Sequence, residues 1–155
     1  MNELSLITAV ASVLIAGVFF TFSSFVMKAL GNIKTSEGIR AMQRINIDVF
    51  SWSFASLFFG IPIASVILGI YAVVNWADPY SIYFLMGSLI YLLGSLLVTG
   101  IRNVPLNNML ARVDPDSTNA IDAWQKYLIS WVHWNHVRAG ASLIAGVVFG
   151  SISIV

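Results

Sequence analysis

Long uninterrupted runs of apolar residues alternate with shorter polar segments along this chain. Three runs, residues 4–30, 49–76 and 80–101, reach the roughly 20 residues that cross a bilayer as a helix. A fourth run, residues 139–155, reaches that length when the tryptophan-rich segment before it is included, which gives residues 131–155. Because lipid offers the backbone no hydrogen-bond partners, each run is predicted to be helical. The pattern therefore predicts an all-α fold, a bundle of four membrane-spanning helices that forms one domain over residues 1–155.

The composition agrees with a protein of the membrane. Hydrophobic residues make up 58% of the chain and charged residues only 10%, where a soluble domain carries about 25% charged residues. The chain has no cysteine, which excludes disulfides and thiolate metal ligands. The N-terminus, MNEL, lacks the basic region of a cleavable signal peptide, so the first span is predicted to be retained.

The basic residues indicate an orientation. All eight lie in the two segments that connect spans one and two and spans three and four: Lys28, Lys34, Arg40, Arg44, Arg102, Arg112, Lys126 and Arg138. The positive-inside rule predicts that both long connections are cytoplasmic and that both termini lie on the outer side of the plasma (inner) membrane. These residues are mixed with acidic ones and face a membrane surface, so nucleic acid is not an expected partner.

The connections are expected to hold helices of their own. Thr35-Ser36 provides an N-cap for a helix predicted to run without interruption into the second span. A turn at residues 114–117 precedes a helix predicted to run into the fourth span. Pro105 is predicted to end the third span near Asn103 and to open a short helix. Small residues are predicted to mark close helix contacts, among them Gly60, Gly87, Gly94 and Gly146.

The segment that enters the fourth span, SWVHWNHVRAG, is unusually polar. At about 100° per residue, one narrow helical face collects six side chains, and Trp134 flanks it, while His133 and His136 point elsewhere. An arginine at the centre of a span costs about 2.5–3.5 kcal/mol, less near the interface. Arg138 could therefore simply reach lipid phosphates, and Asn135 could cap a neighbouring backbone. The six residues of this face are Trp124, Tyr127, Trp131, Asn135, Arg138 and Ser142.

Two further groups of amides are expected at the same depth. Gln43 and Asn46 precede the second span, and Asn103, Asn107 and Asn108 surround Pro105. Amides donate and accept hydrogen bonds without charge, which suits a neutral polar ligand next to lipid. The sequence thus predicts a hollow at the cytoplasmic rim, lined by these amides together with Asn135 and Arg138.

Four segments together resemble the anthrone oxygenase-like family of small four-helix membrane proteins. They are GVFFTFSSFVMKAL at residues 17–30, AMQRIN at 41–46, NVPLN at 103–107, and the W-x3-N-x2-R pattern of Trp131, Asn135 and Arg138. The resemblance implies an oxygenase that turns an anthrone-like tricyclic phenol into a quinone with dioxygen. It implies neither flavin nor haem for that step.

The residues permit a mechanism for such a reaction. A flat substrate would enter from the bilayer and stack on Trp131 or Trp134. Amides would bind its ring oxygens, and Arg138 would stabilise the enolate-like anion that forms when a base removes a ring proton. His136 and Asp48 are the candidate bases. The expected binding amides are Gln43, Asn46, Asn103, Asn107 and Asn135.

Other interpretations stay open. His133 and His136 could ligate a haem or a metal ion, although two histidines without further ligands are a small set. The protein could also be a non-enzymatic accessory subunit that binds a lipid or quinone, or a small transporter. A homo-oligomer is possible under each of these interpretations.

Overall fold

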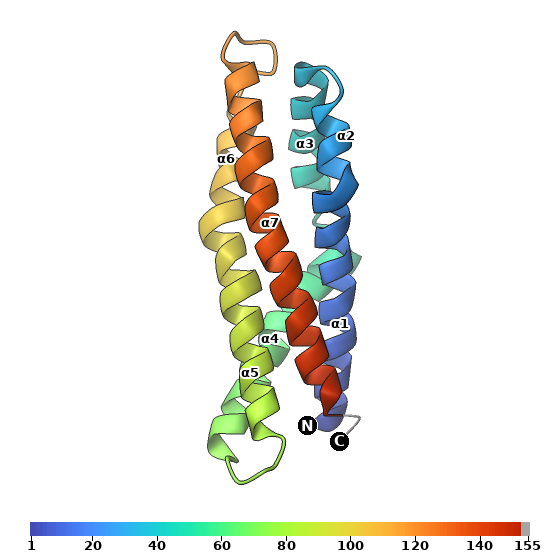
Figure 1. Ribbon diagram of the computed structural model, residues 1–155, viewed down its shortest axis with the longest axis vertical. Helices are drawn as coiled ribbons and strands as arrows, with labels where there is room; N and C mark the ends of the chain where they lie inside the picture. Colours follow the sequence, from blue (N-terminus) through green and yellow to red (C-terminus); the bar gives the residue numbers. More distant parts are fainter. Residues whose placement is uncertain (153–155) are drawn as a thin grey trace.

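The computed structural model describes residues 1–152, and every regular element in this part of the chain is helical (Figure 1). The structure confirms an all-α fold. The elements in order are α1 (Asn2–Thr21), a π-helical turn (Phe22–Val26), α2 (Met27–Gly31), α3 (Thr35–Asp48), α4 (Trp52–Val74), α5 (Ser81–Tyr91), two π-helical turns (Leu92–Leu97 and Thr99–Asn103), α6 (Val104–Ala111) and α7 (Ala120–Ser151).

The helices form one elongated bundle, with the start of α1 and the end of α7 at the same end (Figure 1). The turn between α2 and α3 and the loop between α6 and α7 lie at the opposite end, and α7 packs along both α1 and α5. Three helical stretches in the described chain are long and apolar enough to cross a membrane: Asn2–Gly31, Trp52–Val74 and Ser81–Ala111. The more polar α7 is not among them, and the end of the predicted fourth span, residues 153–155, lies outside the described residues.

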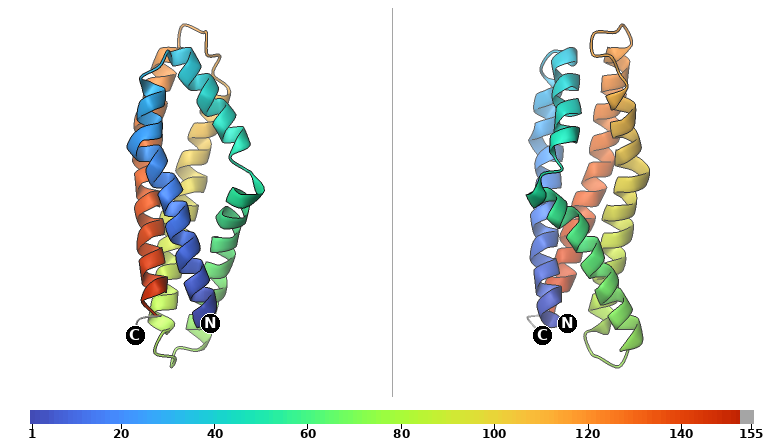
Figure 2. Two further views of the ribbon diagram at one scale, coloured as in Figure 1. Left: turned by 90° about the vertical axis from the view of Figure 1, so that its right-hand side faces the viewer. Right: turned by 180° about the vertical axis from the view of Figure 1, so that it is seen from behind.

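One prediction about the connections is wrong. The helix that begins at Thr35 does not continue into the second apolar run, because residues 49–51 are not helical and separate α3 from α4. Ser51 has an extended backbone, with φ −62° and ψ 156°, and its side chain accepts a hydrogen bond from the Phe54 amide at 3.4 Å. A serine in this geometry caps a new helix and interrupts the old one. Figure 2 shows the chain bowing outward at this break.

Pro105 opens α6 as predicted, but the helical path does not stop before it. Residues Ser81–Ala111 form one continuous helical stretch, and Pro105 occupies the first turn of α6. The π-helical turn Thr99–Asn103 directly precedes it, and the Val104 amide donates to the Thr99 carbonyl. A π-helical turn shifts the pairing of N–H and C=O groups by one residue. The helical path can therefore continue through Pro105, which has no N–H donor.

Two apolar cores lie one above the other along the bundle. The first joins α1, α4, α5 and the end of α7, and includes Ile15, Leu68 and Phe84. The second joins α2, α3, α6 and the start of α7, and includes Met42 and Trp124. Along α7 the polar residues Asn135 and Arg138 lie between Trp131 of the second core and Ala139 of the first.

Close helix contacts occur at three of the four glycines predicted to make them. A Cβ atom built on Gly87 would lie 2.6 Å from the Phe149 ring, and one on Gly94 would lie 2.5 Å from Ala141 Cβ. Gly146 also comes close to α1, where a Cβ would lie 2.9 Å from Val13. Gly60 has nothing within 4 Å, so its expected role in packing is wrong.

Gly87→Ala is expected to lower the stability of the bundle by about 1–3 kcal/mol, because the added methyl must displace the Phe149 ring. Gly60→Ala is the matched control, since its methyl meets open space and alanine favours a helix by about 1 kcal/mol. Thermal unfolding in detergent measures both. Equal melting temperatures for the two variants would contradict the close contact of α5 with α7.

Candidate functional site

A cavity opens between the helices beside the break that separates α3 from α4. Its volume is about 170 Å³, below the roughly 300–1,000 Å³ usual for ligand sites. Phenylalanines, four polar side chains and Arg138 share its wall. The residues that line it are Val18, Phe19, Phe22, Met42, Ile45, Asn46, Val49, Phe50, Phe54, Phe58, Phe59, Thr99, Asn103, Val104, Asn107, Trp131 and Arg138.

The predicted face of α7 is confirmed, because all six of its residues are buried. Arg138 is only 8% exposed, and its guanidinium lies over two aromatic rings, 4.1 Å from the centre of Phe19 and 5.1 Å from the centre of Trp131. Its Nε donates to Asn135 Oδ1 at 2.7 Å and its Nη1 to Thr99 Oγ1 at 3.4 Å. Arg138 therefore faces the interior and does not extend to lipid phosphates.

Within the described residues, no carboxylate forms an ion pair with Arg138. The ion pairs found within residues 1–152, Arg40 with Asp116 and Arg44 with Asp48, both lie on the exposed surface. A guanidinium has five N–H donors, and Arg138 uses two of them. A buried charge without a counter-ion is unfavourable, and cation–π contacts return only about 2 kcal/mol when desolvated. The cavity is thus electrostatically prepared for an anion or a strongly polarised oxygen.

Asn135 ties α7 to the first helical stretch. Its Nδ2 donates to the Phe19 carbonyl at 2.6 Å and also to Ser23 Oγ, while its Oδ1 accepts from Arg138. Phe19 lies in the last turn of α1, just before the π-helical turn at residues 22–26. All of these contacts are to protein groups, so Asn135 positions Arg138 and is not free to bind a ligand.

A second set of hydrogen bonds fixes the amide of Asn107. Its Oδ1 accepts from Tyr127 Oη at 2.9 Å and from Trp131 Nε1 at 2.8 Å. Burial raises the pKa of the Tyr127 phenol above its ordinary value, so this hydroxyl stays protonated and donates. These bonds hold the Asn107 oxygen on the side of α7, and the Asn107 side chain lines the cavity.

The opposite wall is aromatic. Phe50, Phe54 and Phe58 follow one another every four residues across the helix break, with Phe54 and Phe58 stacked at 5.6 Å and 17°. Phe50 meets both rings edge-on, at 6.3 and 6.2 Å. Phe50 and Phe59 are largely exposed, so they form the mouth of the cavity. Flat aromatic surfaces of this kind suit a flat aromatic ligand.

Some predicted site residues lie elsewhere. Gln43 donates to the carbonyls of Leu110 and Val113, at 2.9 and 3.0 Å, and so joins α3 to the end of α6. Trp134 is not in the cavity wall and stacks under the Arg102 guanidinium at 4.5 Å. By contrast, one cavity brings together five of the predicted site residues: Asn46, Asn103, Asn107, Trp131 and Arg138.

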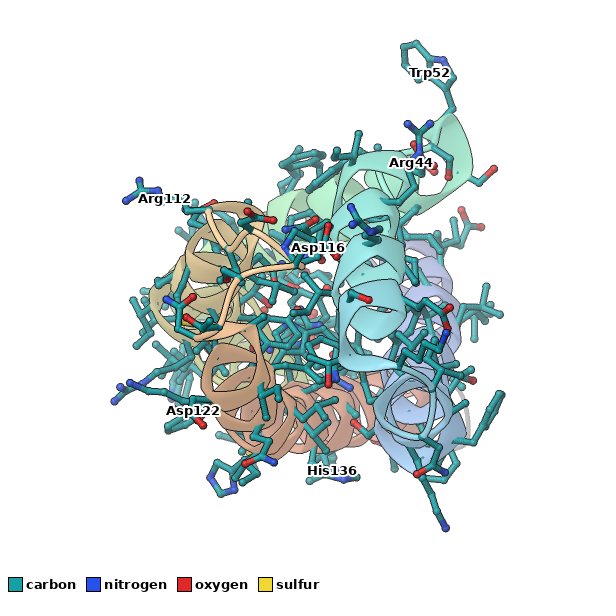
Figure 3. All side chains as sticks on the ribbon, turned by 90° about the horizontal axis from the view of Figure 1, so that it is seen from above. Arg44, Trp52, Arg112, Asp116, Asp122 and His136 are labelled. Atoms are coloured by element: carbon teal, nitrogen blue, oxygen red, sulfur yellow. The ribbon has the colours of Figure 1, made fainter. Side chains whose placement is uncertain are left out.

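The candidate bases are not in the cavity. His136 is exposed and lies at the outer edge of the bundle (Figure 3), where it lines surface hollows beside Gly140. His133 is also exposed, with its ring edge-on to Trp134. Asp48 pairs with Arg44 on the surface. The described residues contain no group of three His, Asp or Glu side chains that could hold a metal ion.

Several functional contacts were missed from the sequence. Thr99 and Ser23, which contact Arg138 and Asn135, carry no pattern that distinguishes them from packing residues. The phenylalanine wall did have a signal in the four-residue spacing of Phe50, Phe54 and Phe58. Tyr127 was placed on the polar face of α7, but its bond to Asn107 was not predicted.

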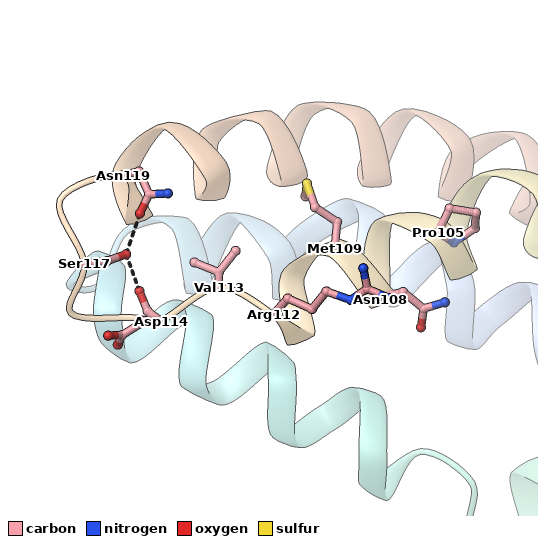
Figure 4. Close-up of a pocket in the computed structure, with 8 residues that line it drawn as sticks. All are labelled: Pro105, Asn108, Met109, Arg112, Val113, Asp114, Ser117 and Asn119. Atoms are coloured by element: carbon pink, nitrogen blue, oxygen red, sulfur yellow. Dashed lines mark hydrogen bonds between the residues drawn. The ribbon is translucent and has the colours of Figure 1, made fainter.

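A larger hollow lies at the loop end, between α6 and the loop that follows it (Figure 4). Its volume is about 650 Å³, and it is lined by Arg112, Asp114 and Ser117 among others. Ser117 Oγ lies 2.6 Å from both the Asp114 carbonyl and Asn119 Oδ1, and its single proton bonds to one of them at a time. The polar groups of this hollow lie on the exposed surface and partly pair with one another, so we assign no ligand to it.

The fold and the cavity define a class: a small all-helical protein with apolar helices fit to cross a membrane and an aromatic cavity that contains an unpaired arginine. The family model described as anthrone oxygenase matches residues 47–148, about two thirds of the chain, so the protein belongs to that family. The match includes NVPLN and the W-x3-N-x2-R pattern. No curated protein and no solved structure matches the chain.

Asn135→Ala is expected to destabilise the protein by about 1–3 kcal/mol, because it leaves the buried Arg138 Nε–H without its acceptor and removes the bond to the Phe19 carbonyl. His136→Ala, one position away on the exposed side of α7, should change stability by less than about 0.5 kcal/mol. Thermal unfolding in detergent compares the two. If Asn135→Ala unfolds at the same temperature as the unaltered protein, the hydrogen bonds of Asn135 do not support the fold.

Proposed function

We propose that this protein is a membrane-embedded oxygenase that converts a flat, phenolic, anthrone-like substrate into a quinone with dioxygen. Membership in the anthrone oxygenase family supports an oxygenase-like function. The observation that carries the proposal is Arg138, a buried cation with free donors and no carboxylate, in the wall of an aromatic cavity.

The substrate stacks between the phenylalanine wall and Trp131, and one ring oxygen approaches Arg138. When the ring carbon opposite that oxygen loses a proton, the negative charge moves onto the oxygen. Donors fixed in advance stabilise such a charge better than water does, because they need not reorient. Arg138 is fixed in this way, since Asn135 and Thr99 hold its Nε and Nη1.

The electron-rich anion then reacts with dioxygen. A carbon–oxygen bond forms, and protonation gives a hydroperoxide at the ring carbon. Loss of the second proton from that carbon, with cleavage of the oxygen–oxygen bond, releases water and leaves the quinone carbonyl. Substrate carbon supplies the electrons and dioxygen is reduced, so the balance needs no further reductant and the family resemblance implies no cofactor for this step.

The proton acceptor is water in this proposal. Neither a carboxylate nor an imidazole lines the cavity, and His136 and Asp48 face the surface. Arg138 makes the substrate more acidic by stabilising its anion, which reduces the need for a strong base.

We further propose that α1 with α2, α4, α5 with α6, and the second half of α7 cross the plasma membrane, with both termini outside. The two connections at the end of the bundle opposite Asn2, between α2 and α3 and between α6 and α7, hold the basic residues Lys34 and Arg112 (Figure 1). Trp52, 94% exposed beside the helix break, projects away from the bundle (Figure 3) and suits the inner interface. The substrate then reaches the cavity from the bilayer through the exposed phenylalanines Phe50 and Phe59, which separate to admit it.

The orientation can be measured cleanly because the chain has no native cysteine. Ala77→Cys places a thiol in the exposed turn between α4 and α5, and Thr118→Cys places one in the exposed loop before α7. A membrane-impermeant maleimide added to intact cells is expected to label the first variant only, and to label the second after permeabilisation. The reverse pattern would contradict the proposed orientation.

Arg138→Gln is expected to lower quinone formation from an anthrone by about 10²–10³-fold, the usual effect of removing one preorganised donor to a developing oxyanion. Arg138→Lys should retain part of the activity, because it keeps the charge but loses the planar fork. Oxygen uptake and quinone absorbance in isolated membranes measure both variants.

Arg102→Gln is the matched control, since Arg102 lies on the exposed side of the same helical stretch and stacks on Trp134 outside the cavity. Its activity is expected to equal that of the unaltered protein. Full activity in Arg138→Gln would rule out the anion-stabilising role. If anthrone bound tightly but was never oxidised, the protein would instead be a quinone-binding accessory protein.

A further inference from the structure

Asn103 leaves one hydrogen-bonding atom without a partner inside the protein. The residue is 1% exposed, lines the cavity, and donates from Nδ2 to the Trp131 carbonyl at 3.3 Å. That bond fixes the orientation of the amide, because two oxygens would repel each other in the same place. The remaining atom, Oδ1, is buried and has no hydrogen-bond partner among the described residues.

The amide oxygens of the two neighbouring asparagines have partners. Asn135 Oδ1 accepts from Arg138, and Asn107 Oδ1 accepts from both Tyr127 and Trp131. Buried polar atoms in native proteins are nearly always paired, so an unpaired acceptor at the wall of a cavity calls for a specific explanation. A purely structural role for Asn103 explains its Nδ2 bond but not the empty acceptor.

The position of Asn103 relates it to Arg138. Thr99, Asn103 and Asn107 recur every four residues along one helical stretch, and all three line the cavity. Residues four apart are neighbours on one side of a helix. Asn103 therefore lies next to Thr99, which accepts from the Arg138 guanidinium. A ligand oxygen at Arg138 would bring adjacent ring positions toward Asn103.

Arg138 and Asn103 require opposite hydrogen-bonding groups on a ligand. Arg138 can only donate hydrogen bonds, and the free atom of Asn103 can only accept one. We infer that Asn103 is a specificity residue that accepts a hydrogen bond from a ligand hydroxyl group, so that the cavity selects hydroxylated aromatic ketones over their ethers and unsubstituted forms. The inference deepens the proposed function and rests on it for the place where the ligand binds.

The test measures binding, not turnover, with ligands that cannot be oxidised further. Purified protein in nanodiscs is titrated with 2-hydroxyanthraquinone, its methyl ether and unsubstituted anthraquinone, in mildly acidic buffer that keeps the phenol neutral. Quenching of tryptophan fluorescence reports occupancy beside Trp131. The unaltered protein is expected to bind the phenol roughly tenfold more tightly than the ether, as one hydrogen bond allows.

Asn103→Leu should remove this preference by weakening phenol binding while leaving ether binding unchanged. Asn103→Gln keeps an amide with both a donor and an acceptor and should keep part of the preference, which covers a Leu variant that fails to fold. Asn108→Leu, an exposed asparagine of α6 that lines the outer hollow and not the cavity, is the matched control and should behave as the unaltered protein.

Equal binding of phenol and ether by the unaltered protein, or no binding of either, overturns the inference; a resident water on Asn103 would produce the first result. A preference that survives in Asn103→Leu also overturns it. The proposed function fails separately: if Asn103 selects the phenol but no anthrone is oxidised, the specificity residue stands and the oxygenase does not.

Discussion

The buried guanidinium of Arg138, held against two aromatic rings with no carboxylate beside it, is the constraint on which the rest of this structure depends. Asn135, Thr99 and the rings of Phe19 and Trp131 surround it. Such an environment keeps the cation in place but does not neutralise it. Protein folds rarely retain an unpaired buried charge without a use for it, and the adjoining cavity supplies that use.

The cavity lies where the regular helices of the bundle are interrupted. The bundle has an apolar core on each side of a polar junction formed by Asn135 and Arg138, and α7 passes through both cores. The break at residues 49–51 separates α3 from α4 beside this junction and places phenylalanines at the mouth. The π-helical turns at residues 22–26 and 99–103 lie close to the same junction, where departures from regular helix are common in functional sites. The irregular backbone segments and the polar side chains therefore lie at the same level of the bundle.

Much of this followed from the sequence, because helical periodicity is a local property. The six residues of the α7 face share a side of the helix, so their burial and the position of Arg138 could be predicted. The partner of Asn135 could not, since Phe19 lies 116 positions away and contributes a backbone atom. The break before Ser51 was hidden by apolar residues that suit a helix equally well. Gln43 was misplaced because an amide that joins two helices has the same local sequence as one that binds a ligand.

The most direct test concerns the charge of Arg138 itself. Hydroxyanthraquinone changes colour when its phenol ionises, and its negative charge is shared with a ring carbonyl. An absorbance titration of the bound dye follows its ionisation. If Arg138 serves an anion, the dye bound to the unaltered protein should ionise at a pH at least about 1 below that of the dye bound to Arg138→Gln, because the contact with Asn103 is the same in both proteins. Ionisation of the bound dye at the same pH in both proteins, or at a lower pH in Arg138→Gln, would contradict the role assigned to this arginine.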